Sequence, residues 1–254
     1  MKIVALIENT TCREDLHCEH GLSLYTECRS HRILFDMGQS GAFAENAETL
    51  GVDLTKVEVA VLSHGHYDHG GGIGRFLETN TQAQIYVNSY VFEGHFNARN
   101  QDIGLNPGLD KRRMIFVDGQ TEIFPGITLH TIPETPGDTS GLQRMVGNKL
   151  VPEDFRHEQY LLLEENGIRV LLSGCAHKGI VQIARFFQPD VLIGGFHLSK
   201  IQDKAVLDQI AGDLLALPTR YYTGHCTGRE QFLSLKQQMG RRLEELHTGS
   251  LLQF

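Results

Sequence analysis

The segment Ser63–Gly72 reads SHGHYDHGGG and places three histidines and an aspartate within six consecutive positions. In an extended segment, His64 and His66 point to the same side, so their ring nitrogens can converge on one metal ion. Asp68 and His69 follow where the chain turns towards a helix, and they face a different direction. One ion cannot take all four ligands from so short a loop without strain. The segment therefore predicts two adjacent metal ions, with a histidine-rich surface loop that binds nothing as the alternative.

Three further histidines follow predicted strands in the second half of the chain. His177 lies in SGCAHKG, His197 in GGFHL and His225 in TGHCTG. The carboxyl ends of strands in α/β sheets form the edge where ligands bind, so these side chains should share one site with the first loop. A two-metal site needs about six protein ligands. We expect His177 and His225 to complete the set, while His197 contacts the substrate or an outer ligand, or is structural.

Apolar runs and helical periodicity alternate along the chain, which favours sheets sandwiched between helices in a single domain over residues 1–254. Residues 61–76 align without gaps to 171–186 with five identities in sixteen positions, which suggests a duplicated architecture. We interpret 97–113 as a long loop or lid and 132–157 as irregular. The predicted strands cover 2–8, 22–28, 32–36, 57–62, 114–117, 127–131, 159–164, 169–173, 191–194 and 220–223; the predicted helices lie near 43–50, 72–78, 177–187, 200–216 and 229–239.

Composition narrows the classes of partner and compartment. With 41% hydrophobic and 21% charged residues the chain is typical of a globular protein. A formal net charge of −8 argues against a nucleic-acid or membrane-surface partner, because both need clustered positive charge. No apolar run is long enough for a signal segment or a membrane span. The five cysteines include no CxxC pair, which favours reduced thiols and a cytoplasmic location.

The HGHYDH segment resembles the HxHxDH signature of the metallo-β-lactamase superfamily. That resemblance implies an αββα sandwich of two mixed sheets flanked by helices, with a dinuclear metal site. Across nearly the whole chain, further segments resemble the dihydropteroate-synthase-like branch, which includes an archaeal synthase of methanopterin biosynthesis. These segments are EHGLS (19–23), LFDMGQSG (34–41), LSHGHYDHGGG (62–72), SGCAHKGI (173–180), GGFHL (194–198) and TGHCTG (223–228).

The resemblance also implies an assignment of ligands. It places one ion on His64, His66 and His177, and the other on Asp68, His69 and His225. Asp36 matches an aspartate that orients the metal loop without binding an ion, although a plain turn residue is the alternative. For the two divalent ions, histidine and carboxylate ligands suit zinc first, with manganese or iron as alternatives.

Two positions depart from the commoner hydrolases of the superfamily. The chain reads TPGDTSG at 135–141, with Asp138 where many members have a histidine, and SGCAH, with Cys175 where they have a bridging aspartate. We interpret Cys175 as a buried thiol that does not bind metal, with a soft bridging ligand as the alternative. These differences argue against a direct transfer of β-lactamase or glyoxalase activity.

We therefore predict a metal-dependent hydrolase in which activated water attacks a small anionic ester or phosphoester. Asp68 would orient the water, and His197 or His20 would donate a proton to the leaving group. The alternatives are a pterin-condensing synthase, in which the ions hold a pyrophosphate leaving group, and a non-catalytic metal-binding module. The expected partner is a small molecule; the residues predict neither its identity nor the oligomeric state.

Overall fold

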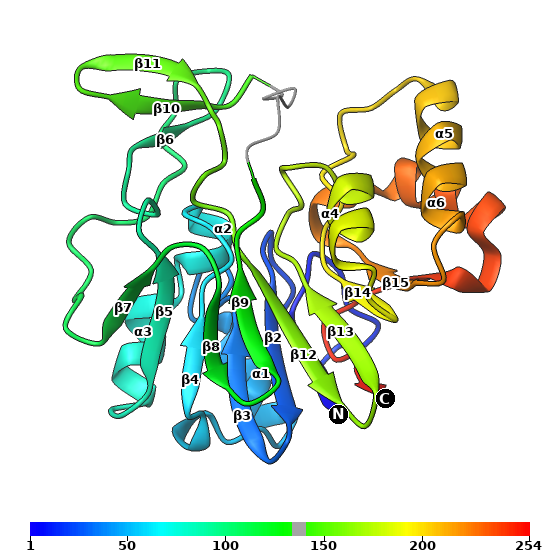
Figure 1. Cartoon of the computed structure of the whole chain (residues 1–254). Coiled ribbons are helices and arrows are strands. Elements are labelled where there is room, and N and C mark those ends of the chain that lie inside the picture. The colour runs from blue at the N-terminus through cyan, green and yellow to red at the C-terminus, as the bar shows by residue number, and fades with distance from the viewer. Residues whose placement is uncertain (134–140) are drawn as a thin grey trace.

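Two seven-stranded sheets face one another and helices cover their outer faces in the computed structural model, which describes residues 1–133 and 141–254 (Figure 1). The strand orders are β17-β1-β2-β3-β4-β5-β7 and β16-β15-β14-β13-β12-β9-β8. Each sheet contains both antiparallel and parallel pairs. The predicted αββα sandwich of mixed sheets is confirmed.

The first sheet belongs to the first half of the chain, except for one strand at its edge. Strands β1, β2 and β3 pair antiparallel, and β3, β4, β5 and β7 continue in parallel. The elements are β1 (Lys2–Ile7), β2 (Ser23–Cys28), β3 (His31–Phe35), β4 (Val59–Val61), β5 (Gln84–Asn88), β7 (Met114–Val117), β17 (Leu251–Gln253), α1 (Ala42–Thr49), the short helix η1 (Leu54–Lys56), α2 (Tyr67–Gly70) and α3 (Ile73–Thr79).

The second sheet repeats this plan with an antiparallel hairpin followed by parallel strands. In the predicted ENG turn between β12 and β13, Asn166 has φ 53° and Gly167 has φ 79°, the two positive values that a tight hairpin turn needs. The elements are β8 (Thr121–Phe124), β9 (Ile127–His130), β12 (Tyr160–Glu165), β13 (Ile168–Leu172), β14 (Val191–Ile193), β15 (Arg220–Thr223), β16 (Leu243–Glu245), α4 (Ile180–Phe187), α5 (Lys204–Leu215), α6 (Arg229–Met239) and the short helices η2 (His225–Thr227) and η3 (Gly240–Arg242).

The central strands are apolar on both faces because each sheet is covered twice. In β3, Ile33 and Phe35 belong to the core between the two sheets, whereas Leu34 belongs to the core beneath α1 and α3. Successive side chains on a strand point to opposite faces. A sheet packed on both sides therefore needs the continuous apolar runs seen in the sequence.

The prediction that residues 132–157 are irregular is wrong for part of that segment. Strands β10 (Gln143–Val146) and β11 (Lys149–Pro152) form a hairpin that pairs with β6 (His95–Phe96) in a third sheet. Their side chains are mostly half-buried or exposed, so the alternating apolar pattern of a strand is absent. Asp138, expected at a departure from the superfamily pattern, lies outside the described residues.

Two predicted helices begin later than expected. The helix predicted over 177–187 begins at Ile180, because His177 belongs to the loop after β13. The helix predicted over 200–216 begins at Lys204, where the side chain of Asp203 caps it by accepting a hydrogen bond from the backbone N–H of Ala205. Strands β5, β8, β16 and β17 were not predicted.

The internal similarity between 61–76 and 171–186 holds for the strands and fails for the helices. Leu62 and Leu172 are both fully buried, at or just after the end of β4 and β13. Phe76 is fully buried on α3, but its counterpart Phe186 is 55% exposed on α4. The two halves therefore share the way a strand leads into the site, and they differ in how the following helix packs.

The segment 97–113 contains no helix or named strand, and part of it is tied to the histidine loop. The carbonyl of Ile103 accepts a hydrogen bond from the N–H of Tyr67 at 2.9 Å, and its own N–H donates to the carbonyl of His95 at 2.8 Å. Ile103 also lines the main pocket. Movement of this segment as a lid stays a prediction.

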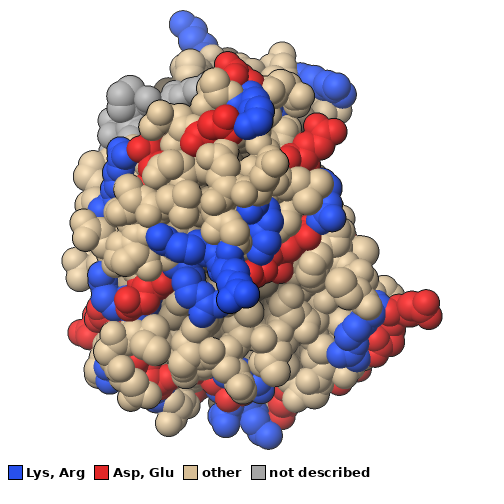
Figure 2. Space-filling view, turned by 90° about the vertical axis from the view of Figure 1, so that its right-hand side faces the viewer, with Lys and Arg blue, Asp and Glu red and all other residues tan. Residues whose placement is uncertain are grey.

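Basic and acidic side chains are interspersed on the face over α5 and α6 (Figure 2). Several of them form ion pairs, including Lys204–Asp208, Arg229–Glu245 and Lys236–Glu244. Within the described residues, none of the helices has the length and apolar character needed to cross a membrane.

Candidate metal centre

Asp36 connects the end of β3 to the histidine loop. One carboxylate oxygen of Asp36 accepts the backbone N–H of Ser63 at 2.7 Å, and the other accepts the Ser63 hydroxyl at 2.7 Å. This second oxygen also lies 2.7 Å from Nδ1 of His69. An imidazole that donates Nδ1–H to a carboxylate keeps its Nε2 lone pair free for a metal. The contact agrees with the orienting role expected for Asp36.

The first cluster consists only of imidazoles. One ring nitrogen from each of His64, His66 and His177 lies within 4.8 Å of the other two, and the two Nε2 atoms of His64 and His177 are 3.4 Å apart. All three side chains are buried. Burial lowers the pKa of His64 and His177 well below the ordinary value and that of His66 to about 3. The rings are therefore neutral at pH 7, which is the form that binds a metal ion.

The second cluster combines a carboxylate, a thiol and two imidazoles, namely Asp68, Cys175, His69 and His225. The Nε2 atom of His69 lies 3.1 Å from Nε2 of His225 and 3.2 Å from Sγ of Cys175. One Asp68 oxygen lies 3.3 Å from Nε2 of His225. We expected Cys175 to be a buried thiol that does not bind metal; the thiol is buried, and its sulfur lies among these donor atoms.

These spacings fit metal ions. Two nitrogens bound to zinc at ~2.0–2.1 Å with tetrahedral angles lie ~3.4 Å apart. The measured nitrogen–nitrogen separations are 3.4 Å in the first cluster and 3.1 Å in the second. The donor atoms thus converge as the ligands of two neighbouring ions would.

Charged side chains in and beside the second cluster shift one another's pKa values. Burial lowers the pKa of His69, but the carboxylates of Asp36 and Asp68 outweigh it and raise that pKa to about 9. Burial likewise raises the pKa of Asp68, but His69 and the hydrogen bonds from His20 and His225 lower it well below its usual range. Without a metal, His69 is therefore protonated and Asp68 ionised at pH 7.

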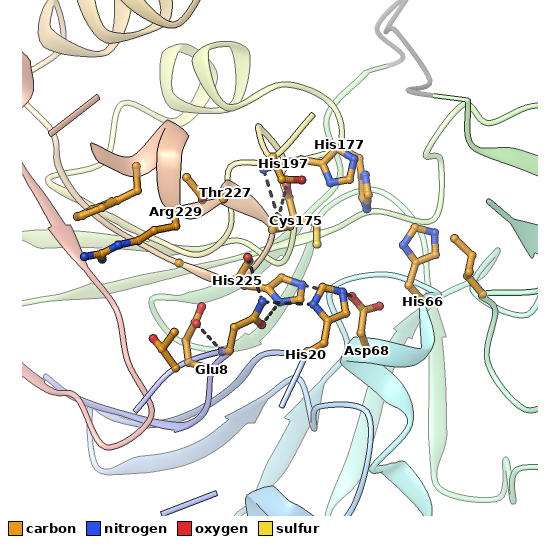
Figure 3. Close-up of a pocket in the computed structure, with 18 of the residues that line it drawn as sticks. Glu8, His20, His66, Asp68, Cys175, His177, His197, His225, Thr227 and Arg229 are labelled. Carbon is orange, nitrogen blue, oxygen red and sulfur yellow. Dashed lines mark hydrogen bonds and ion pairs between the residues drawn. The ribbon is translucent and has the colours of Figure 1, made fainter. Parts of the chain in front are cut away.

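A pocket of about 520 Å³ opens onto residues of both clusters (Figure 3). Of the two predicted proton donors, His20 is half-exposed and its Nε2 lies 3.3 Å from an Asp68 oxygen; this hydrogen bond raises the His20 pKa. The ring centroid of His197 lies 4.3 Å from that of His177, and its backbone N–H donates to Sγ of Cys226 at 3.2 Å. Both side chains line the pocket, and their roles as proton donors stay predictions.

Several residues of the site were missed. Asn9, at the end of β1, accepts from Nδ1 of His225 at 2.9 Å and donates to the His225 carbonyl at 3.2 Å, so it fixes the ring with Nε2 towards the cluster. Beside it, burial raises the pKa of Glu8 to about 8. The buried thiol of Cys226 approaches Cys175 and His197. Asn9 carries the same signal as Asp36, a polar residue next to the end of a buried strand, and Cys226 lies in the TGHCTG segment quoted above.

Comparison with known proteins identifies relatives of the whole chain. The 7,8-dihydropterin-6-methyl-4-(beta-D-ribofuranosyl)-aminobenzene-5'-phosphate synthase of Methanocaldococcus jannaschii is 27% identical over 270 aligned positions, which cover 93% of this chain and 90% of the relative. An uncharacterized protein of the same organism is 25% identical, covering 92% of this chain and 94% of its own length.

Solved structures share the fold. A metal-dependent hydrolase of the beta-lactamase superfamily superposes with a TM-score of 0.84 at 23% identity, over 100% of this chain and 99% of the other. Zinc-bound PqqB from Methylobacterium extorquens gives a TM-score of 0.61 at 14% identity, over 100% of both chains. The family model of the metallo-beta-lactamase superfamily matches residues 29–225, so this chain belongs to that superfamily.

Proposed function

We propose that this chain is a metal-dependent enzyme that uses two adjacent divalent ions to hydrolyse a small anionic ester or phosphoester. The observation that carries the proposal is the meeting of two ligand clusters at the edge of one pocket of about 520 Å³. Pockets of this size suit small-molecule substrates. A purely structural metal site is usually closed, so the open pocket supports catalysis over simple metal storage.

When bound, two such ions lower the pKa of a water molecule and polarise a phosphoryl or carbonyl oxygen. The residues around them supply orientation and protons. Asp68 lines the pocket, and we propose that its carboxylate orients the attacking water by accepting a hydrogen bond. His20 lies 3.3 Å from Asp68 and lines the pocket, so it can donate a proton to the leaving group. His197, beside His177, can contact the substrate or act as the second proton donor.

The donor atoms of the two clusters also indicate which metal they prefer. Imidazole and carboxylate ligands accept zinc, manganese or iron. The thiol of Cys175 in the second cluster adds a soft donor, which favours zinc over manganese. We therefore propose zinc in both clusters.

A second candidate function is a synthase reaction, favoured by the relative from M. jannaschii that is named as a synthase and matches 93% of this chain. In this case a dihydropterin-type substrate would bind with its pyrophosphate at the ions, and the nitrogen of an aromatic amine would replace water as the attacking group. The new carbon–nitrogen bond forms as the bond to pyrophosphate breaks, and the amine loses a proton. The same pocket and the same two clusters would serve both reactions.

One experiment separates the two functions. Zinc-loaded protein is incubated with phosphomonoesters, phosphodiesters and a hydroxymethyl-dihydropterin pyrophosphate, each with and without 4-aminobenzoate as the amine. Phosphoester cleavage without the amine supports the hydrolase, whereas a product formed only with the amine supports the synthase. If protein with two bound zinc ions turns over none of these substrates, the phosphoester hydrolase and the synthase are both wrong. The His66→Ala variant serves as the inactive control.

A further inference from the structure

A group of buried polar side chains lies behind His66, outside the two clusters described above. His95 and His157 are completely buried. One ring nitrogen of each lies within 4.8 Å of a ring nitrogen of His66 and of the other. The rings of His66 and His95 meet nearly at right angles, with their centroids 5.6 Å apart. The Nε2 atoms of all three rings are buried and find no hydrogen-bond partner among residues 1–133 and 141–254.

Glu153 determines which nitrogen of His95 carries the proton. One Glu153 oxygen lies 2.7 Å from Nδ1 of His95, and both side chains are 1% exposed. The other Glu153 oxygen accepts the backbone N–H groups of Asp154 and Phe155 at 3.1 and 3.2 Å. Because a carboxylate only accepts hydrogen bonds, Nδ1 of His95 is the protonated nitrogen and Nε2 holds a lone pair.

That lone pair faces the histidine loop. A side-chain carbon added at Gly65, between His64 and His66, would lie 2.9 Å from Nε2 of His95. The absence of a side chain at Gly65 thus allows His95 to approach the backbone of the loop. His95 presents an acceptor towards the loop, where His66 offers a ring nitrogen within 4.8 Å.

The three histidines do not form a third metal site. The backbone N–H of Gly65 donates to Nδ1 of His157 at 2.8 Å. A backbone N–H can only donate, so Nδ1 of His157 is unprotonated and the proton of the neutral ring is on Nε2. His157 therefore offers a donor where a metal ion would need a lone pair, which leaves His66 and His95 as the only two ligands of this group.

We propose that Glu153 and His95 position His66 as a metal ligand. His66 binds its ion through Nδ1, and its Nε2–H donates to Nε2 of His95, directly or through one water molecule. The separation of up to 4.8 Å between ring nitrogens is compatible with one bridging water. This chain of hydrogen bonds runs from the Glu153 carboxylate through His95 to His66, and it fixes the orientation of the His66 ring. The inference rests on the metal centre of the proposed function.

The size of the effect follows from comparable arrangements. Removing an outer partner of a metal-binding histidine typically lowers metal affinity by about 10–100-fold. Glu153→Gln keeps the shape of the side chain while it removes the charge that holds His95. His95→Ala removes the acceptor itself. We expect both variants to lower the affinity of the first cluster for zinc by about 10–100-fold, and His95→Ala to have the larger effect.

The first test measures zinc affinity by competition with a chromophoric chelator, with folding checked by circular dichroism of the metal-free proteins. The matched control is His31→Ala, because Nδ1 of His31 lies 2.9 Å from Glu58 in a similar histidine–glutamate pair that belongs to neither cluster. His31→Ala should bind zinc like the unmodified chain. If His95→Ala does not fold, Glu153→Gln carries the test.

A second measurement separates positioning from a general structural role. In zinc-loaded protein with ¹⁵N-labelled histidines, long-range ¹H–¹⁵N spectra report which ring nitrogen carries the proton. We expect the proton of His66 on Nε2 and that of His95 on Nδ1. A His66 proton on Nδ1, or unchanged zinc affinity in Glu153→Gln, would overturn this inference and leave the proposed function intact. A chain that binds no zinc at all would instead overturn the proposed function, and this inference with it.

Discussion

The two ligand clusters differ in charge although they share one pocket and one loop. The imidazole cluster, His64, His66 and His177, contributes no charge, because burial keeps its rings neutral. The mixed cluster, Asp68, His69, Cys175 and His225, contains an ionised carboxylate and, without metal, a protonated histidine. The difference arises from two carboxylates, Asp36 and Asp68, which outweigh burial and raise the His69 pKa; of the two, Asp36 lies 2.7 Å from Nδ1 of His69. The ligands of the two metal sites are therefore in different protonation states before metal binds, although the histidine loop contributes to both.

The largest expected effect is the loss of a ligand from the imidazole cluster. His66→Ala should lower the affinity for the first ion by more than about 100-fold, since the loss of an outer partner already costs about 10–100-fold. The mixed cluster keeps all four of its ligand side chains. Metal analysis of the variant should therefore find about one ion per chain and no turnover. An unchanged metal content would show that His66 is not a ligand.

Asp36→Asn should affect the mixed cluster and spare the imidazole cluster. It removes the carboxylate that holds Nδ1 of His69 at 2.7 Å, so the affinity for the second ion should fall by about 10–100-fold. The buried bonds from Ser63 are also weakened, at a cost of about 1–3 kcal/mol in folding stability. Sequential zinc titration measures both affinities, and Asp53→Asn, an exposed helix cap, is the control. An equal loss of affinity for both ions would contradict the claim that Asp36 acts on the mixed cluster alone.

Dependence on pH should also distinguish the clusters. A metal that binds His69 must displace its proton, and the pKa of about 9 means that this proton is present throughout pH 6–8. The affinity of the mixed cluster should therefore rise at least about tenfold for each pH unit in this range, and more steeply where the Cys175 thiol, whose pKa burial raises, also gives up its proton to bind. The pKa of His66 is about 3, so the imidazole cluster has no proton to lose there and its affinity should stay constant. Calorimetric zinc titrations at pH 6, 7 and 8 check this, and parallel slopes would contradict it.

The smallest expected effect concerns metal preference. Cys175→Ser replaces the soft donor of the mixed cluster by a hard one, so zinc should lose affinity there while manganese changes little. The ratio of the two affinities is measured by competition. Cys28→Ser, another buried cysteine that lies in β2, serves as the control. A zinc-to-manganese ratio that Cys175→Ser leaves unchanged would show that the thiol is not a ligand.

The sequence predicts the parts of the site that follow strands, and it misses those that meet by tertiary packing. His64 to His69 form a recognisable motif, and His177 and His225 each lie in the segment that follows a strand, so chain topology alone brings them to one edge. His95 and Glu153 are 58 positions apart and meet only because β6 pairs with β10 in the third sheet. Neither residue lies in a motif or after a predicted strand, so no local pattern reveals their contact.

The same reasoning explains which parts of the fold could be predicted from the sequence. The central strands of the two large sheets are apolar on both faces, and their runs are visible without any structure, whereas β5, β8, β16 and β17 were not predicted. The hairpin of β10 and β11 is half-exposed and short, and its stability comes from pairing with β6, which propensity does not reveal. The place of Cys175 is hard to predict for a related reason: a buried cysteine is usually a small apolar residue, and only the structure puts its sulfur 3.2 Å from Nε2 of His69.

The most direct test of the central claim is anomalous scattering at the zinc edge from crystals of the zinc-loaded protein. We predict two peaks about 3.5–4 Å apart, one among His64, His66 and His177 and the other among Asp68, His69, Cys175 and His225. A single peak, or peaks outside these clusters, would contradict the assignment of two adjacent ions to this pocket.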